Sequence, residues 1–331
     1  MLIIVGAILV TLCVFGGFML AGGNIMTVAE AAAVELFIIG GGAFGAFVVA
    51  NSMKTLKSTI GGTLALLKPA KFQRADYIDL LKLLYEILQK IRKDGLMSIE
   101  DHVENPTNSA IFQKYPKVLE DHHLLDFTTD CLRLIIGGNL APHELEGLLE
   151  VELETHHKEA HTPSHALQTV ADGLPAFGIV AAVLGIVKVM SIVGDAPPAV
   201  IGQKVASALV GTFLGILLGY GYVGPVANAL GARADEDSKP FEIVKMALIA
   251  YLRGYPPQVA IEFARKLLFS DVRPNFQDLE AELKARLFDR TNRRVHLTEA
   301  GSRFLIHARR IEHEYNLAQA SVSGAAPGEL L

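Results

Sequence analysis

The chain has 331 residues, of which 51% are hydrophobic and 20% are charged, and its formal net charge is −5 at pH 7. Its mean hydropathy of +0.35 is unusually high for a soluble globular protein. The two cysteines, Cys13 and Cys131, are too few for a disulfide framework, so the composition gives no sign of a disulfide-stabilised secreted domain.

Four stretches of the chain carry almost no charge. Residues 1–29, 36–53 and 205–232 contain no charged side chain, and residues 173–194 contain only Lys188. Because a bilayer core is crossed by about 20 apolar residues, we predict four transmembrane spans. The first run has no basic segment before it and is longer than the apolar core of a signal peptide, so we interpret it as a span.

Basic residues indicate the orientation of these spans. Lysines and arginines follow the second and fourth spans, whereas the loops between spans one and two and between spans three and four have few. Basic flanks stay in the cytoplasm, so both termini and the long middle segment are expected to be cytoplasmic. The prediction is an all-α polytopic membrane protein with four transmembrane helices and a large helical cytoplasmic domain between spans two and three. The predicted divisions are 1–53 (spans one and two), 54–171 (cytoplasmic domain), 172–232 (spans three and four), 233–285 (cytoplasmic helices) and 286–331 (a tail of different character).

One proline stands near the cytoplasmic end of each of the last two spans. Pro175 lies in "DGLPAFGIVAAVLGIVK", where span three is expected to begin, and Pro225 lies in "GYGYVGPVANALG", near the end of span four. A proline in a first helical turn costs nothing, whereas Pro225 would leave the carbonyl of Gly221 without its helical partner. For either proline alone a plain helix start is an equal alternative, but a pair at similar depth favours a hinge.

The predicted spans carry small side chains and uncharged polar groups in their interior. Span four carries the hydroxyls of Ser207 and Thr212, and no Asp, Glu or His is expected deep in any span. If the protein conducts ions, the titrating carboxylate is then expected from another chain, since such residues form proton relays. Otherwise the spans are an anchor. Stripes of small residues, which let membrane helices approach closely, lie at Gly178, Ala181, Ala182 and Gly185 in span three and at Gly211, Gly215 and Gly219 in span four.

The cytoplasmic segment begins with an amphipathic pattern. Residues 74–94 place leucines and isoleucines on one face and end before Gly95, which predicts a helix. Ser98 and Asp101 have the spacing of a capping box for a following helix. Arg92 and Glu100 would complement the dipoles of these two helices.

After a helix at roughly 117–136, an acidic helix is expected to begin at Pro142. It contains His157 and His161 four residues apart, beside His156, but no cysteine and no HExxH pattern, so we predict an exposed polar face and no metal site. The sequence shows no nucleophile–base pair and no phosphate-binding glycine loop. We expect neither an enzyme nor a cofactor.

Several long blocks resemble one family. The blocks "DGLPAFGIVAAVLGIVK", "LVGTFLGILLGYGYVGPVA", "ENPTNSAIFQKYP" and "RGYPPQVAIEFARKLLFSDVRPNFQDLE" are similar to MotA, the A subunit of the bacterial flagellar stator. The resemblance runs from Met1 to about Leu283 in the same order and topology. It implies a protein of the bacterial inner membrane that forms a homo-oligomer around a dimer of a B subunit. A B-subunit Asp would carry protons beside spans three and four, and protons are favoured over sodium because the blocks look more like MotA than PomA.

The resemblance also assigns residues. It implies that Pro175 and Pro225 couple ion movement to the cytoplasmic domain and that Thr212 lies near the ion path, with Ser207 on the same helix. Arg92 and Glu100, in "IRKDGLMSIE", match the pair thought to interact with charges on the rotor protein FliG.

The tail resembles a different family. In "RLFDRTNRRVHLTEAGSRFLIHARRI", residues 286 to about 315 are similar to the C-terminal half of a LysR-type winged helix-turn-helix domain. Arg290, Arg293 and Arg294 would contact phosphates, but the recognition helix is absent, so no sequence-specific DNA binding is expected. We interpret 286–331 as a fusion or frameshift remnant whose last residues, "SVSGAAPGELL", are disordered.

Two alternatives stay open from the sequence. One is a proton-driven energy transducer of the ExbB/TolQ type, which shares the proline-bounded spans but usually has three spans in place of four. The other is a membrane-tethered transcription regulator, against which the missing recognition helix counts.

Overall fold

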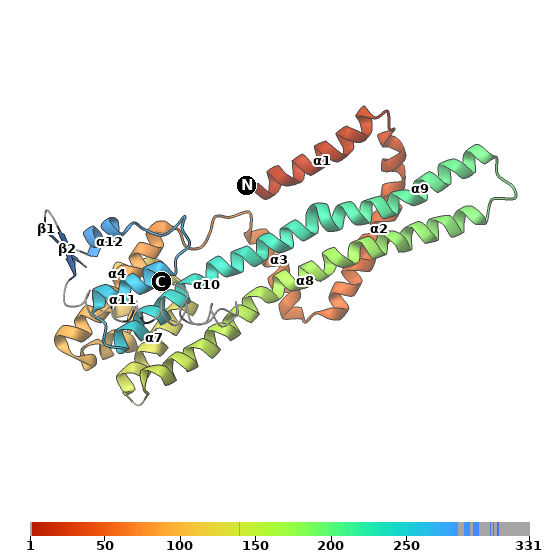
Figure 1. Cartoon of the computed structure of the whole chain (residues 1–331). Helices are drawn as coiled ribbons and strands as arrows, with labels where there is room; N and C mark the ends of the chain where they lie inside the picture. The colour runs from red at the N-terminus through yellow and green to blue at the C-terminus, as the bar shows by residue number, and fades with distance from the viewer. Residues whose placement is uncertain are drawn as a thin grey trace, which may run out of the picture. The chain divides into compact units, whose positions relative to one another are not determined.

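The computed structural model describes residues 2–138, 140–283, 288–291 and 294–297, together with residues 305, 307 and 310. Within these residues the chain is helical apart from one short hairpin, so the predicted all-α fold is confirmed (Figure 1). The helices are α1 (Leu2–Leu20), α2 (Ile25–Ala50), α3 (Met53–Ala65), α4 (Arg74–Asp94), α5 (Glu100–Glu104), α6 (Pro116–Glu120), α7 (His122–Gly137), α8 (Pro142–Met190), α9 (Pro198–Ile216), α10 (Gly224–Leu252), α11 (Pro257–Lys266) and α12 (Phe276–Leu283). Short 3-10 turns cover Leu96–Ile99, Pro106–Asn108 and Phe112–Lys114.

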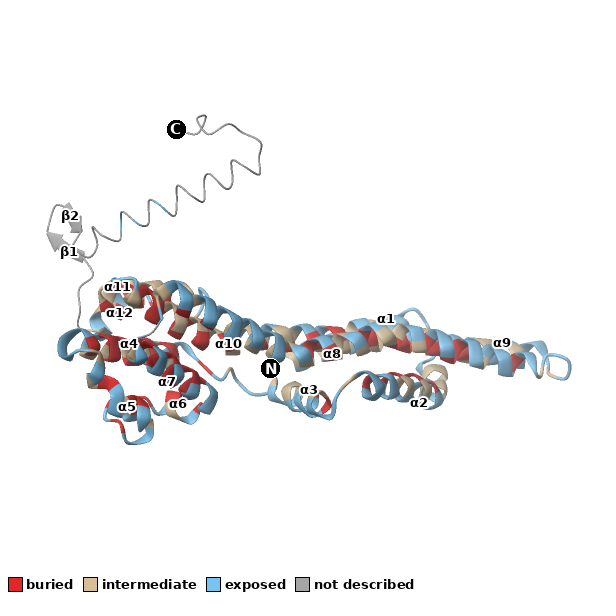
Figure 2. Ribbon diagram, turned by 90° about the horizontal axis from the view of Figure 1, so that it is seen from below, coloured by how far each residue is buried: buried red, intermediate tan, exposed pale blue. Residues whose placement is uncertain are grey.

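Four helical stretches are long and apolar enough to cross a membrane, as the sequence predicts. They are α1, α2, α8 and the run Pro198–Leu252, which comprises α9, a π-helical segment and α10. Large apolar side chains are exposed along them, for example Leu2 at 87% and Val49 at 88% (Figure 2). Hydrocarbon accommodates such a surface and water does not, so the protein is a multi-pass membrane protein.

The chain folds as two compact units. The first unit consists of residues 1–70 and 156–237, and the second consists of residues 71–155 and 238–331. Helices α8 and α10 contribute residues to both. The division into five segments made from the sequence stays a prediction.

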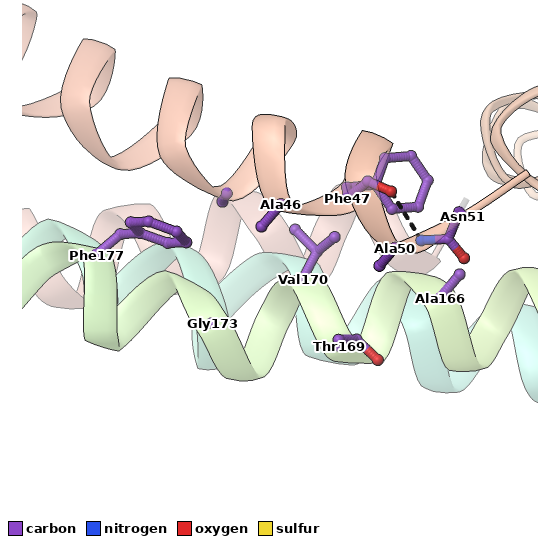
Figure 3. Close-up of a pocket in the computed structure, with 10 residues that line it drawn as sticks. Ala46, Phe47, Ala50, Asn51, Ala166, Thr169, Val170, Gly173 and Phe177 are labelled. Carbon is purple, nitrogen blue, oxygen red and sulfur yellow. Dashed lines mark hydrogen bonds between the residues drawn. The ribbon is translucent and has the colours of Figure 1, made fainter.

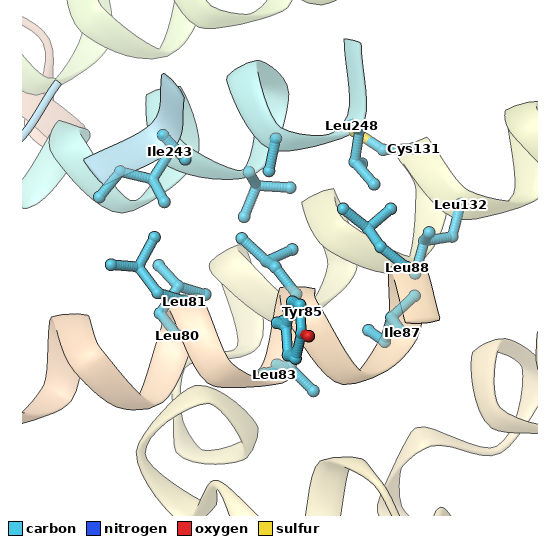
Figure 4. Packing of buried hydrophobic residues seen from close by; sticks show 14 of the residues in the cluster. Leu80, Leu81, Leu83, Tyr85, Ile87, Leu88, Cys131, Leu132, Ile243 and Leu248 are labelled. Atoms are coloured by element: carbon cyan, nitrogen blue, oxygen red, sulfur yellow. The ribbon is translucent and has the colours of Figure 1, made fainter. Parts of the chain in front are cut away.

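The core of the second unit is built around α4. Leu80, Leu84 and Leu88 recur at four-residue spacing on α4 and are 0% exposed. They pack in one cluster with Leu132 of α7 and Leu248 of α10 (Figure 4). Each fully buried leucine contributes about 1.5–3 kcal/mol relative to an exposed one, so the periodicity that predicted this helix also accounts for its packing.

The segment after α4 differs from the prediction at one point. Gly95 ends α4 with a φ of 86°, a value that glycine adopts without strain. The predicted capping box of Ser98 and Asp101 is wrong: the Ser98 hydroxyl donates to the carbonyl oxygen of Gly95 at 2.6 Å, and Ile99, without a side-chain cap, precedes α5. Ser98 is part of the 3-10 turn Leu96–Ile99, so it does not occupy the N-cap position of α5.

In the first unit, α2 packs with α8 and α9. The buried cluster includes Ile39 and Ala43 of α2, Ala181 of α8 and Leu214 of α9. The small-residue stripes are in contact, since a Cβ atom added at Gly178 would lie 2.8 Å from the carbonyl oxygen of Gly211. The close approach predicted for these helices is therefore present.

The start of the second span differs from the prediction. The uncharged runs that end at residue 29 and begin at residue 36 leave Glu30 and Glu35 in the predicted loop between the first two spans, but α2 begins at Ile25 and both lie on it. The Asn24 side chain accepts a hydrogen bond from the backbone N–H of Met26 at 2.9 Å, which caps the helix there. The uncharged run alone therefore placed the start of the span about ten residues too late.

The start of the third span also differs. No helix begins near Asp172, because α8 runs without a break from Pro142 to Met190 with Pro163 and Pro175 inside it. Pro175 is therefore an interior proline and does not occupy a first turn. An interior proline removes one helical hydrogen bond.

The hairpin lies in the tail. Strands β1 (Phe288–Thr291) and β2 (Arg294–Leu297) pair antiparallel, with Phe288 opposite Leu297 and Thr291 opposite Arg294. It lies within residues 286 to about 315, the stretch that resembles the C-terminal half of a winged helix-turn-helix domain. Arg293 and the segment predicted to be disordered lie outside the described residues.

Candidate functional site

The two prolines lie in long helices of the first unit, and the one at position 225 follows an irregular segment. Immediately before α10, residues Leu217–Val223 form a π-helical segment, and the backbone N–H of Gly224 donates to the carbonyl oxygen of Gly219, five residues earlier. Pro225 follows directly. A proline cannot donate to the residue four positions before it, and the wider π turn accommodates this loss. Such turns produce bends and are frequent at functional sites.

Pro175 of α8 lies next to this π segment. Pro175 has no N–H to offer the carbonyl oxygen of Ala171. A Cβ atom added at Gly219 would lie 2.6 Å from that oxygen and 3.1 Å from Cδ of Pro175. The glycine therefore lets the π segment approach the turn of α8 in which Pro175 leaves one carbonyl oxygen without its helical donor.

A pocket adjoins the same part of α8. It is lined mostly by apolar side chains of α2 and α8, including Phe47, Val170, Gly173 and Phe177 (Figure 3). Gly173 and Phe177 stand two residues before and after Pro175, so the pocket is lined by the same part of α8. At one end of the pocket the Asn51 side chain donates to the carbonyl oxygen of Phe47 at 2.9 Å.

The two predicted ion-path hydroxyls lie in α9. Ser207 is partly buried and donates to the carbonyl oxygen of Gln203 at 3.1 Å, within its own helix. Thr212 is also partly buried, and its Cα would lie 3.3 Å from a Cβ atom added at Gly178. Thr212 is thus at the contact of α8 and α9.

A buried carboxyl group in the first unit was missed by the sequence analysis. Glu35 of α2 is 8% exposed, and its Oε2 has no hydrogen-bond partner within the described residues. A Cβ atom added at Gly211 of α9 would lie 2.6 Å from Oε2, and one at Gly185 of α8 would lie 4.0 Å from Oε1. The expectation that no acid lies within the spans is therefore wrong.

A signal for Glu35 exists in the sequence. The buried residues of α2 are Glu35, Ile39, Ala43 and Phe47, at a strict spacing of four. Residues four apart share one helix face, so continuing the apolar stripe one turn backwards reaches Glu35. Buried acids in membrane helices are rare and mark functional positions.

The predicted rotor residues belong to the second unit. Arg92 lies in the last turn of α4 and Glu100 is the first residue of α5, and both are exposed. Neither forms an ion pair with another described residue. Their positions suit the helix dipoles, and their side chains are accessible to a partner.

The histidine cluster is more organised than predicted. His161 of α8 is partly buried, and its Nε2 lies 2.9 Å from Oδ1 of Asp235 on α10. Nε2 of His157 lies 3.9 Å from the same oxygen. The sequence predicted only an exposed polar face for these histidines.

Two protein-family models match the chain. The motility protein A N-terminal family matches residues 4–95, and the MotA/TolQ/ExbB proton channel family matches residues 120–243. Neither model reaches the tail, and a short hairpin occurs in many folds, so the LysR-type resemblance of residues 286–331 gains no support.

Individual proteins agree with the family models. Motility protein A of Salmonella typhimurium (strain LT2) is 45% identical over 285 residues, which are 86% of this chain and 96% of that protein. Motility protein A of Escherichia coli (strain K12) has the same identity and coverage. A chain of the structure entitled "Structure of C. jejuni MotAB" superposes with a TM-score of 0.64 at 18% identity, covering 81% of this chain and 96% of that chain, which supports the fold.

The four spans, the irregular turns and these matches define a multi-pass membrane protein of the proton-channel class. The chain belongs to the motility protein A branch of the MotA/TolQ/ExbB proton channel family. The N-terminal family match and the relatives favour this branch over the ExbB/TolQ alternative.

Proposed function

We propose that this chain is the A subunit of a flagellar stator in the bacterial inner membrane, with both termini in the cytoplasm. Several copies surround a dimer of a single-span B subunit, whose Asp carries protons beside α8 and α9. Solved structures with a similar fold are entitled as MotAB complexes, which supports such a partner. The basic residues that follow α2 and α10 support the orientation.

The observation that carries the mechanism is the contact between the two proline-containing parts of α8 and α10. The Ala171–Pro175 turn of α8, which lacks one helical hydrogen bond, and the π segment before Pro225 meet at Gly219. Helical turns without their regular hydrogen bonds can pack against each other in more than one arrangement. A small difference in free energy then selects between these arrangements. We assign Pro175 and Pro225 as coupling residues on this basis.

The energy released by one proton that crosses the membrane is sufficient to shift such a conformational equilibrium. One elementary charge that moves through 100 mV releases about 2.3 kcal/mol, and conformational equilibria of this kind differ by a few kcal/mol. When the partner Asp gains or loses a proton, the charge next to α8 and α9 changes. The altered packing then passes along α8 and α10, which continue into the second unit.

The ion path is assigned to the faces of α9 that contact α2 and α8. Thr212 supplies a hydroxyl group there, Ser207 supplies another on the same helix, and Glu35 adds a carboxyl group of this chain against Gly211. The partner Asp and Glu35 are then two acidic groups of the same membrane bundle, one from each chain.

The rotor contact is assigned to Arg92 and Glu100 of the second unit. Both are exposed and carry opposite charges only eight residues apart. They would pair with charges on the rotor switch protein FliG. One exposed pair contributes only about 0–1 kcal/mol, so several pairs must act together.

The test of coupling is rotation of single motors. Cells that express the chain with its B subunit would be tethered by one flagellum, and torque would be compared for Pro175→Ala, Pro225→Ala and the double variant. A matched control is Pro198→Ala, because Pro198 is at the first position of α9, where proline removes no hydrogen bond. We expect the double variant to lose torque and the control to keep it. Equal torque in all four strains would remove the prolines from the mechanism.

A further inference from the structure

The histidines of α8 and one aspartate of α10 form a cluster that the stator mechanism does not use. One ligand atom each from His157, His161 and Asp235 lies within 4.8 Å of the other two. The three residues are all part of the first unit. None of the three belongs to the coupling, ion-path or rotor residues.

The cluster is held by close packing of the two helices. The buried Ser164 hydroxyl of α8 donates to the carbonyl oxygen of Ala227 of α10 at 2.8 Å. One turn along α10, a Cβ atom added at Gly231 would lie 3.0 Å from the Ser164 hydroxyl and 3.9 Å from Cε1 of His161. Asp235 follows one turn later. The close contact at Ser164 and Gly231 therefore fixes Asp235 opposite the histidines.

The two histidines converge on one oxygen. Their ring centroids are 4.3 Å apart, and Oδ1 of Asp235 lies 2.9 Å from Nε2 of His161 and 3.9 Å from Nε2 of His157. Histidines four residues apart on a helix share one face. A metal ion bound at about 2.0–2.2 Å from each ligand needs the donor atoms a few ångströms apart, which this arrangement already provides with small side-chain rotations.

We propose that His157, His161 and Asp235 form a binding site for one divalent transition-metal ion that links α8 to α10. Two imidazoles and one carboxylate suit zinc, nickel, copper or iron. Calcium and magnesium take oxygen ligands and are excluded by the imidazoles. Three protein ligands leave coordination positions for water. A bound ion fastens the two helices side by side.

The sequence alone could not reach this site. The histidine pair by itself has no third ligand, and Asp235 lies 74 residues after His161. The packing of Gly231 against Ser164 brings the third ligand into place.

The test is zinc binding by the purified full-length chain, measured by competition with a chromophoric chelator. The variants are His157→Ala, His161→Ala and the isosteric Asp235→Asn. The matched control is His123→Ala, which removes an exposed histidine of α7 in the second unit. Circular dichroism of each variant checks that it is folded. The native chain and the control should bind one zinc ion at this site, and each ligand variant should lose at least about tenfold in affinity.

Two further readouts separate this site from surface histidines. Cobalt(II) bound to the native chain should give visible absorption bands of a low-symmetry site, and these bands should disappear in His161→Ala. Zinc should raise the unfolding temperature of the native chain and the control but not that of the ligand variants, because a ligand stabilises only the state that binds it. Zinc affinity that is equal in the native chain and all three ligand variants would overturn the proposal.

Discussion

Replacing Gly215 with alanine tests whether the contact of α8 with α9 controls the membrane bundle. An added Cβ atom would lie 2.7 Å from the carbonyl oxygen of Leu174 and 2.9 Å from Cα of Gly178. Both neighbours are backbone atoms, so no side chain can rotate away. Relaxed carbon contacts lie at about 3.5–4.0 Å, so the two helices must move apart.

The size of the effect follows from two opposing contributions. Overpacking by one methyl group costs about 1–3 kcal/mol. Alanine is favoured over glycine inside a helix by about 1 kcal/mol. Since the clash is with backbone, we expect a net destabilisation of up to about 2 kcal/mol for Gly215→Ala.

The matched control is Gly45→Ala. Gly45 is inside α2, and nothing lies within 4 Å of a Cβ atom added there. This variant should gain up to about 1 kcal/mol from helix propensity alone. The assay is the free energy of unfolding of the purified chain in detergent, from denaturant titration. If Gly215→Ala is as stable as Gly45→Ala, the close-packing argument for α8 and α9 fails.

Three further predictions concern single groups. Glu35→Leu should stabilise the purified chain by about 1–3 kcal/mol, because it removes a buried oxygen without a partner, and it should lower ion flux. The control Glu30→Leu should change neither stability nor flux, and native flux in Glu35→Leu would exclude Glu35 from the ion path. Burial is the main cause that raises the pKa of the Cys131 thiol, so the reactive thiolate should not form in the folded second unit at pH 8. In a Cys13→Ser background, which removes the exposed cysteine, maleimide should label Cys131 only after unfolding, and rapid labelling of the folded chain would contradict its burial. Arg92→Ala should reduce swimming modestly, and Arg92→Glu with Glu100→Arg should reduce it severely, whereas normal torque in the double reversal would remove these residues from the rotor contact.

The spans and the amphipathic helix could be predicted because each depends on local pattern. Uncharged runs of about 20 residues suffice for a membrane helix, and the leucine spacing of residues 74–94 predicts α4 and its core face. The stripes of small residues likewise predicted which faces of the third and fourth spans pack. In each of these cases the pattern lies within a single helix.

The helix boundaries and the missed residues depend on contacts between distant segments. Local rules place a helix start at Pro175, but α8 continues through it, and the carbonyl oxygen of Ala171, which the proline leaves without its helical donor, lies against Gly219. Charge counting placed Glu35 in a loop, whereas the glycines at positions 185 and 211 create room for it inside the bundle. Neither contact is visible in a window of sequence, since each joins different helices.

The most direct measurement of the central claim is complementation. Residues 1–285 would be expressed together with the cognate B subunit in a strain that lacks its own stator, and the rotation of tethered cells would be recorded with and without collapse of the proton gradient. The account predicts that rotation is restored and stops when the gradient is collapsed. A correctly inserted and assembled complex that produces no rotation would contradict it.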